Sequence, residues 1–196
     1  MEFQDVIRKR KMIRSYLDKP IDRETIDFIL ENAIRAPSAG FSQGWGFLVL
    51  EEEADRKRFW ESNWPDREED QRWMTMVNAP VIIIPMAHKQ AYLDRYAEPD
   101  KGWEDKDEAR WPVPFWLIDT SFAAENILLT VTDLGLGALF FGVDTPRFRE
   151  AFGVPEAYEP IGAISIGHPA PSDRPSPSLK RGRRGIEEVV RRGSWS

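Results

Sequence analysis

Cysteine is absent from the 196 residues of this chain. Without thiols the protein has no disulfides, no thiolate zinc or iron–sulfur sites and no cysteine nucleophile. Histidine is scarce as well, because the two present, His88 and His168, lie far apart and lack the spacing of a metal-binding pair. We therefore expect no metal site and no thiol chemistry.

Long apolar runs are also missing. No stretch reaches the roughly 18 apolar residues of a membrane-spanning helix, and the first twenty residues are too polar for the apolar centre of a secretory signal peptide. Hydrophobic residues make up 41% of the chain and aromatic residues 12%, which is enough to bury a full core at this length. We expect a single globular domain over residues 1–196, located in the cytoplasm and without a membrane partner.

Positive charge is the minority sign, since the formal net charge is −6 and the pI is about 5.1. Such a chain as a whole repels nucleic acid, so we expect no nucleic-acid partner. Two basic clusters nevertheless stand out, at residues 8–11 and 180–184. The charge pattern leaves three interpretations open: a solvated helix end, a patch for an acidic partner or nucleic acid, or a phosphate clamp built from arginines.

Apolar periodicity and turn residues predict helices that alternate with extended segments. Helices are expected at residues 2–9, from an Asp22 N-cap to a point before Pro37, within 53–76, at 115–134 before Gly135, and briefly after Asp144. Strands are expected within 45–51, 80–87, 137–143 and 159–167, with extended chain from Met12 to Pro20. This alternation indicates a protein that contains both helices and strands.

Two segments point beyond a single compact domain. The helix expected at 115–134 has almost no charged surface, so it should be covered on more than one side, by the core and by a second subunit. The tail after Gly167 is rich in proline and is predicted to form an extended arm, residues 168–196.

Several motifs together resemble the FMN-dependent nitroreductases. The family pattern R-x-S-x-R/K followed by an aromatic residue is similar to "RKMIRSY" from Arg10, and its loop A-P-S-x-x-N-x-Q-P-W is similar to "APSAGFSQGW". "DLGLGALFFGV" resembles the family element that ends at the flavin, and "RRGIEEVV" its C-terminal basic segment. The resemblance implies a nitroreductase-like α+β fold with a central mixed, mostly antiparallel sheet flanked by helices and an extended C-terminal arm.

The resemblance also implies a set of FMN-binding residues. Arg10 and Lys11 open the motif, with Arg10 the better candidate for the FMN phosphate, and Met12 follows them. Arg14 matches the basic residue beside the pyrimidine edge and would tune the flavin, so no side chain is expected to act as a catalytic group itself. The other matching positions reach the flavin of the other subunit, pass close to the ring, or close on the phosphate: Pro37, Ser38, Ala39 and Phe41; Phe141 and Gly142; Arg181 and Arg183.

Three positions depart from the family pattern. Met12 stands in place of the family serine, Phe41 in place of the asparagine, and Gly44 in place of the proline before tryptophan. Two polar contacts to the flavin are thus lost, and backbone groups and apolar packing are expected to replace them.

Six of the eight tryptophans lie between residues 60 and 116. Trp60, Trp73 and Trp116 are expected to pack in the core. Trp103 and Trp111 lie in a charged, proline-rich stretch, so residues 97–114 are a candidate lid insertion whose aromatic side chains flank a planar acceptor substrate.

The implied activity is that of a homodimeric flavin-dependent oxidoreductase with FMN at the subunit interface. NADH or NADPH would donate hydride to flavin N5, and a nitroaromatic, quinone or similar small acceptor would take the electrons in a ping-pong cycle. Two alternatives stay open. One is an FMN-binding relative with another reaction, such as dehalogenation, flavin cleavage or deazaflavin-linked reduction, and the other is a non-catalytic protein that binds an anion or an acidic partner.

Overall fold

The computed structural model describes residues 1–65 and 74–195. Its helices are α1 (Phe3–Lys9), α2 (Arg23–Ala33), α3 (Glu53–Asn63), α4 (Lys89–Tyr96), α5 (Phe115–Asp133), α6 (Thr145–Phe152) and α7 (Ile186–Val189). Short 3₁₀ turns are η1 (Ala39–Phe41), η3 (Met74–Asn78), η4 (Glu108–Arg110) and η5 (Pro177–Arg181). The strands are β1 (Trp45–Leu50), β2 (Val81–Ala87), β3 (Gly137–Phe141), β4 (Glu159–Pro160) and β5 (Ala163–Gly167). Part of the predicted 53–76 helix and the predicted core residue Trp73 lie outside the described residues.

The helix ends follow the predicted local chemistry. The Asp22 carboxylate accepts a hydrogen bond of 2.8 Å from the Thr25 N–H and caps α2. At the end of α5, Gly135 adopts a left-handed φ of +73°. This conformation lets the Leu136 N–H reach the Val131 carbonyl at 3.0 Å, which is a Schellman ending.

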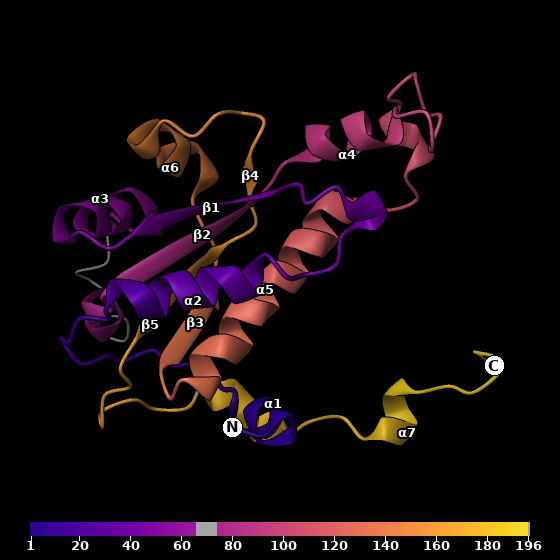
Figure 1. Ribbon diagram of the computed structural model, residues 1–196. Helices are drawn as coiled ribbons and strands as arrows, with labels where there is room; N and C mark the ends of the chain where they lie inside the picture. The colour runs from indigo at the N-terminus through magenta and orange to yellow at the C-terminus, as the bar shows by residue number, and fades with distance from the viewer. Residues whose placement is uncertain (66–73, 196) are drawn as a thin grey trace.

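The strands form one sheet in the order β1-β2-β5-β3, with β4 beside β2, and every pair of strands is antiparallel (Figure 1). A parallel bridge between Met12 and Ala138 adds the N-terminal segment next to β3. The α+β prediction is therefore confirmed. The prediction of one continuous strand at 159–167 was wrong, because Gly162, with φ of +150°, separates this segment into β4 and β5.

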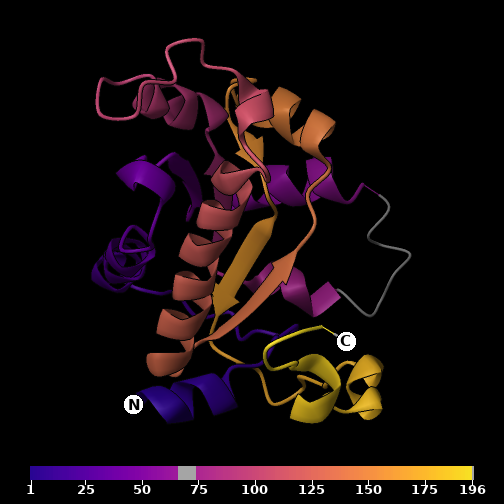
Figure 2. The ribbon, with the colours of Figure 1, turned by 90° about the vertical axis from the view of Figure 1, so that its right-hand side faces the viewer.

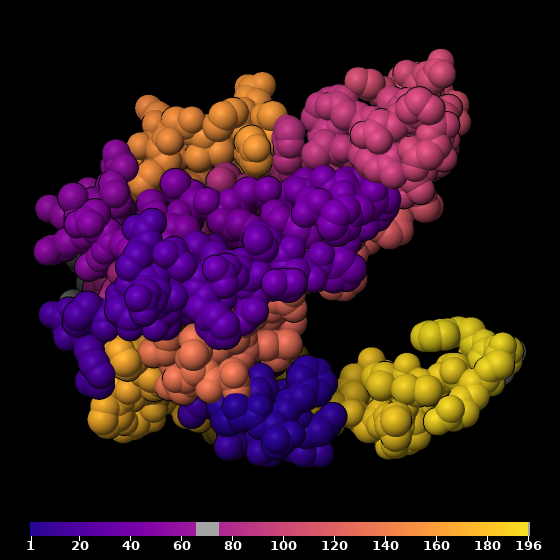
Figure 3. All heavy atoms as spheres, viewed as in Figure 1, coloured from indigo at the N-terminus to yellow at the C-terminus, as the bar shows by residue number. Residues whose placement is uncertain are grey.

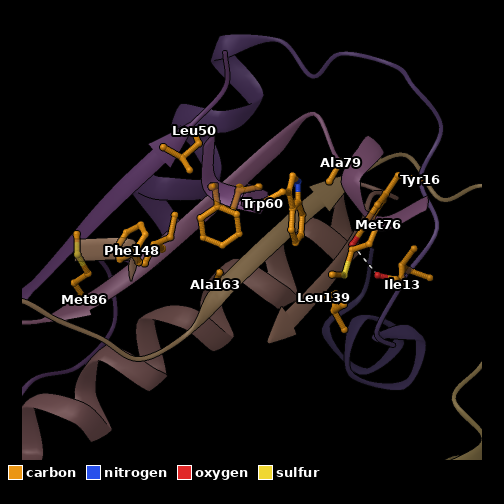
Figure 4. Packing of buried hydrophobic residues seen from close by; sticks show 13 residues of the cluster. Ile13, Tyr16, Leu50, Trp60, Met76, Ala79, Met86, Leu139, Phe148 and Ala163 are labelled. Atoms are coloured by element: carbon orange, nitrogen blue, oxygen red, sulfur yellow. Dashed lines mark hydrogen bonds between the residues drawn. The ribbon is translucent and has the colours of Figure 1, made fainter. Parts of the chain in front are cut away.

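The sheet carries a hydrophobic layer on each face. Alternate residues of β2 point to opposite sides, so that Val81 and Ile83 pack with α2 and α5, whereas Ile82 and Ile84 pack with α3 and α6. Figure 2 shows α5 running alongside β3 and β5. Figure 4 shows the other layer, where Trp60 and Phe148 lie over the sheet.

The two ends of the chain meet the body differently. Residues 13–17 join the sheet region, since the Ile13 N–H donates to the Ala138 carbonyl and the Leu17 N–H to the His168 carbonyl, both at 2.9 Å. After Ala170 the chain leaves the core, and the segment with α7 extends away from the body, as predicted for an arm (Figure 3). Within the described part of the chain, no helix is long and apolar enough to cross a membrane.

Candidate cofactor site

The first basic cluster leads from helix α1 into the edge of the sheet. Arg10 ends α1 and lies 3.6 Å from the Glu125 carboxylate of α5. Lys11 is exposed, and Met12 is half-buried beside Ala138. The next cation, Arg14, is half-buried, and its backbone N–H donates to Asp173 at 2.8 Å. The predicted flavin motif thus lies as an extended chain along β3.

Arg14 borders two cavities at this edge. The first, of ≈ 480 Å³, also takes in Phe141, Gly142 and Asn63. The second, of ≈ 490 Å³, is lined by Arg14 together with Ser15 and residues 172–177 of the arm. A further cavity of ≈ 260 Å³ lies around Met12 and Glu125 and shares Phe140 with the first. Arg14, Phe141 and Gly142 therefore line the first cavity, and Met12 lines the neighbouring one, where Arg10 pairs with the lining residue Glu125.

An aromatic wall closes one side of the first cavity. The Phe141 ring is stacked on Trp60, with centroids 5.5 Å apart and planes 12° apart, and Trp64, which also lines the cavity, stacks on Trp60 with centroids 6.4 Å apart. Trp60 is 2% exposed and Trp116 5%, so both predictions of core packing are confirmed. The buried Trp60 thus backs the side of the cavity that Phe141 and Trp64 line.

Gly142 leaves the cavity open where β3 ends. A Cβ atom added at Gly142 would meet nothing within 4 Å. The turn after it is held by Asn63, whose side chain accepts from the Asp144 N–H at 2.6 Å and donates to the Gly142 carbonyl at 3.4 Å. An apolar wall, an open glycine and a guanidinium group match the needs of a planar ring with a polar edge. The donor set therefore fits a flavin.

The loop residues Pro37, Ser38, Ala39 and Phe41 do not join this group. They precede or form η1, which lies beside α4 and the N-terminal end of α5, whereas α1 lies at the other end of α5 (Figure 1). Phe41 is 74% exposed and adopts a left-handed φ of +56°. In one protomer, the loop is therefore separated from Arg10 and Arg14 by the length of a helix.

Trp103 and Trp111 lie near that loop instead of near Arg14. The Trp111 ring is 4.4 Å from Tyr96 and 5.4 Å from Trp103, and it also contacts Tyr92 and Trp116. The indole N–H of Trp111 is buried without a hydrogen-bond partner. The 97–114 segment is consequently packed onto α4 by its aromatic side chains.

Arg181 and Arg183 lie on the exposed arm. The arm meets the segment that follows the first basic cluster: Asp173 accepts from the Arg14 N–H, and the Ser15 and Ser172 hydroxyl groups lie 2.7 Å apart. Arg174, which the sequence did not single out, borders the same cavity as Arg14. Asn63 was missed as well, because the last residue of a charged helix carries no sequence signal for a role at a distant strand end.

Comparison with known proteins agrees with this geometry. The model of the nitroreductase family matches residues 7–168. A protein of Archaeoglobus fulgidus, provisionally described as an NADH dehydrogenase/NAD(P)H nitroreductase, is 31% identical over 170 residues, which cover 84% of this chain and 83% of the relative.

Solved structures share the fold over nearly the whole chain. An NADH oxidase, provisionally so named, from Clostridium acetobutylicum has a TM-score of 0.70 at 26% identity, covering 97% of this chain and 100% of its own. A nitroreductase from Exiguobacterium sibiricum, also provisionally named and solved in complex with FMN, has a TM-score of 0.72 at 22% identity and covers 100% of this chain and 98% of its own. The chain belongs to the nitroreductase family and is an oxidoreductase.

Proposed function

We propose that this protein is an FMN-dependent NAD(P)H oxidoreductase that reduces a nitroaromatic, a quinone or a similar small acceptor. The observation that carries the proposal is the first cavity, where Arg14, the Phe141 wall and the open backbone at Gly142 face the same space. Bound FMN would supply two-step hydride transfer through N5, from NADH or NADPH to the acceptor. Because this cycle needs the cellular pool of pyridine nucleotides, we propose a cytoplasmic location.

The chain's own residues would bind and orient the cofactor. Arg10, with Arg181 and Arg183 of the arm, would hold the phosphate, since a buried phosphate needs charged donors in place of water. Arg14 lines the first cavity, and its positive charge would favour negative charge on a ring that occupies it. Gly142 would offer its backbone N–H to the ring.

A second copy of the chain would complete the site. The residues implied as flavin contacts lie in two separate places of one protomer, around Arg14 and around η1, so both can serve one cofactor only if two chains meet. The α5 helix supports this arrangement, because Phe122 on its outer side is 47% exposed. We therefore propose a homodimer with FMN at the interface. Family membership favours this function over a non-catalytic protein that binds a partner.

The absorbance spectrum of the purified protein tests the proposal. We expect flavin bands that acid precipitation releases into the supernatant, and reduction of these bands by NADH or NADPH. Absence of flavin after incubation with FMN would overturn the proposal.

The variant Gly142→Ala sharpens this test. Its methyl group enters open space, so the fold should remain as stable as the wild type, whereas FMN affinity should fall about tenfold or more because the methyl group occupies the cavity. Equal affinity in the variant and the wild type would place the cofactor elsewhere.

A further inference from the structure

A buried carboxylate lies behind the η1 loop. Asp119 of α5 is 3% exposed. One of its oxygens, Oδ2, accepts a hydrogen bond of 2.8 Å from the Ala39 N–H and one of 2.9 Å from the Tyr92 hydroxyl group. A single oxygen atom therefore joins three elements, η1, α4 and α5.

Among the described residues, no cation lies within ion-pair distance of this carboxylate. Across residues 1–65 and 74–195, no ion pair involves Asp119. Burying a carboxylate is costly unless donors replace its hydration. Charge-assisted hydrogen bonds to a backbone N–H and a hydroxyl group are stronger than neutral ones. The two donors are therefore held firmly in place.

The loop that Asp119 holds is strained. Phe41 and Gln43 adopt left-handed φ values of +56° and +49°, which residues other than glycine rarely adopt. Such a conformation persists only where its surroundings impose it. Three hydrogen bonds impose the strained conformation here. The Ala39 N–H donates to Asp119, and the Gln43 N–H donates to the Ser38 hydroxyl group at 3.0 Å. The Arg95 Nε donates to the Gly40 carbonyl at 2.9 Å.

The same network reaches the 97–114 segment. Arg95 of α4 also makes two hydrogen bonds to Asp100, at 2.7 and 2.8 Å. Tyr92, the second donor to Asp119, lies edge-on to Trp111, with ring centroids 5.9 Å apart. Burial, and next to it the Asp119 carboxylate, raise the pKa of Tyr92 above its usual value, so the hydroxyl group stays protonated and donates.

We propose that Asp119 is a positioning residue that fixes the Ser38–Phe41 loop in its strained shape and ties it to α4 and the aromatic segment. This inference rests on the proposed function, in which that loop contacts the FMN bound by a second copy. The cofactor then meets a loop that is already ordered, and little conformational entropy is lost on binding. Loss of the Asp119 contacts would weaken FMN binding from a distance.

The test compares Asp119→Asn and Asp119→Ala with a neighbouring control. Asparagine keeps an acceptor oxygen but loses the charge, whereas alanine leaves the Ala39 and Tyr92 donors unpaired. We expect the Kd for FMN to rise about threefold to tenfold in Asp119→Asn and further in Asp119→Ala. We also expect the KM for the acceptor to rise more than kcat falls, because the loop positions ligands and takes no part in the chemistry.

Thr120→Val is the matched control. Thr120 is fully buried on the same helix, and its hydroxyl group donates to the Trp116 carbonyl of its own helix, at 2.7 Å. The Thr120→Val variant should have a lower Tm than the wild type and the same Kd for FMN. Titrations of FMN fluorescence are made well below the lowest Tm, so that every variant is folded.

The outcomes separate the two proposals. A wild-type protein that takes up no FMN overturns the proposed function and this inference with it. If the wild type binds FMN, two results would overturn the role of Asp119 alone. Either the Kd for FMN of Asp119→Asn equals that of the wild type, or it changes only as much as that of Thr120→Val. The graded order of wild type, asparagine and alanine supports it.

Discussion

Tyr16 connects the N-terminal segment to the centre of the sheet through one hydroxyl group. The group donates to the Ile13 carbonyl at 2.7 Å and lies 3.0 Å from the Ser165 hydroxyl group, and the residue is 2% exposed (Figure 4). Burial raises the pKa of Tyr16, so the hydroxyl group stays protonated. Arg14 precedes it by two residues, and its position therefore depends on this anchor.

Tyr16→Phe should lower the free energy of unfolding by about 1–3 kcal/mol, because buried polar partners lose their donor. Urea denaturation measures this change. Tyr158→Phe is the control, since Tyr158 contributes its ring, stacked on His88 at 4.6 Å. A Tyr16→Phe variant as stable as this control would show that the ring alone anchors the segment.

Gly44 shows how a departure from the family pattern can serve packing. A Cβ atom at this position would come within 2.5 Å of the Tyr92 ring and 2.8 Å of the His88 carbonyl oxygen. A proline would therefore displace Tyr92, which donates to Asp119. The glycine is explained by the space that this tyrosine needs.

At the scale of elements, α4 and the 97–114 segment behave as one aromatic unit. Trp111 contacts Tyr92 and Tyr96 of α4 and Trp116 of α5. The lid hypothesis remains a proposal, but the packing implies that such a lid would move together with α4 and the η1 loop.

Trp111→Ala should lower the free energy of unfolding by about 3 kcal/mol, because the cluster loses its central ring. It should also raise the KM for the acceptor more than the Kd for FMN, since the η1 loop keeps its bond to Asp119. Steady-state kinetics measure the KM for the acceptor, and flavin titration measures the Kd for FMN. Trp111→Phe retains a ring, so its free energy of unfolding and its KM for the acceptor should lie between those of the wild type and Trp111→Ala. Equal losses of acceptor and FMN binding would show that Trp111 is purely structural.

At the scale of the whole molecule, the arm carries more apolar surface than an isolated chain should expose. Its large hydrophobic side chains are exposed by 41% to 83%: Leu179, Ile186, Val189, Val190 and Trp195. Such a set indicates a surface that contacts another chain. Asp173, which binds the Arg14 backbone, precedes this part of the arm.

A chain truncated after Pro175 should therefore fold, because it keeps the core and Asp173, but the proposed dimer should be weaker. The Kd for FMN should rise at least about tenfold with the loss of Arg181 and Arg183. Analytical ultracentrifugation and flavin titration measure both properties against the full chain. A truncated chain that dimerises and binds FMN as the full chain does would leave the arm without this role.

Local residue patterns set the secondary structure of this protein and the side-chain chemistry available to it. Caps such as Asp22, the glycine at 135 and the apolar stripes predict the helices and strands because these signals act over a few residues. The motif around Arg10 and Arg14 likewise shows its resemblance without any fold. Which distant residues meet is visible in the folded chain alone: Asn63 holds the Gly142 turn, Asp173 binds the Arg14 backbone, and Asp119 holds the η1 loop. These contacts join residues 79, 159 and 80 positions apart, and packing of the whole chain sets them, not any local pattern of residues.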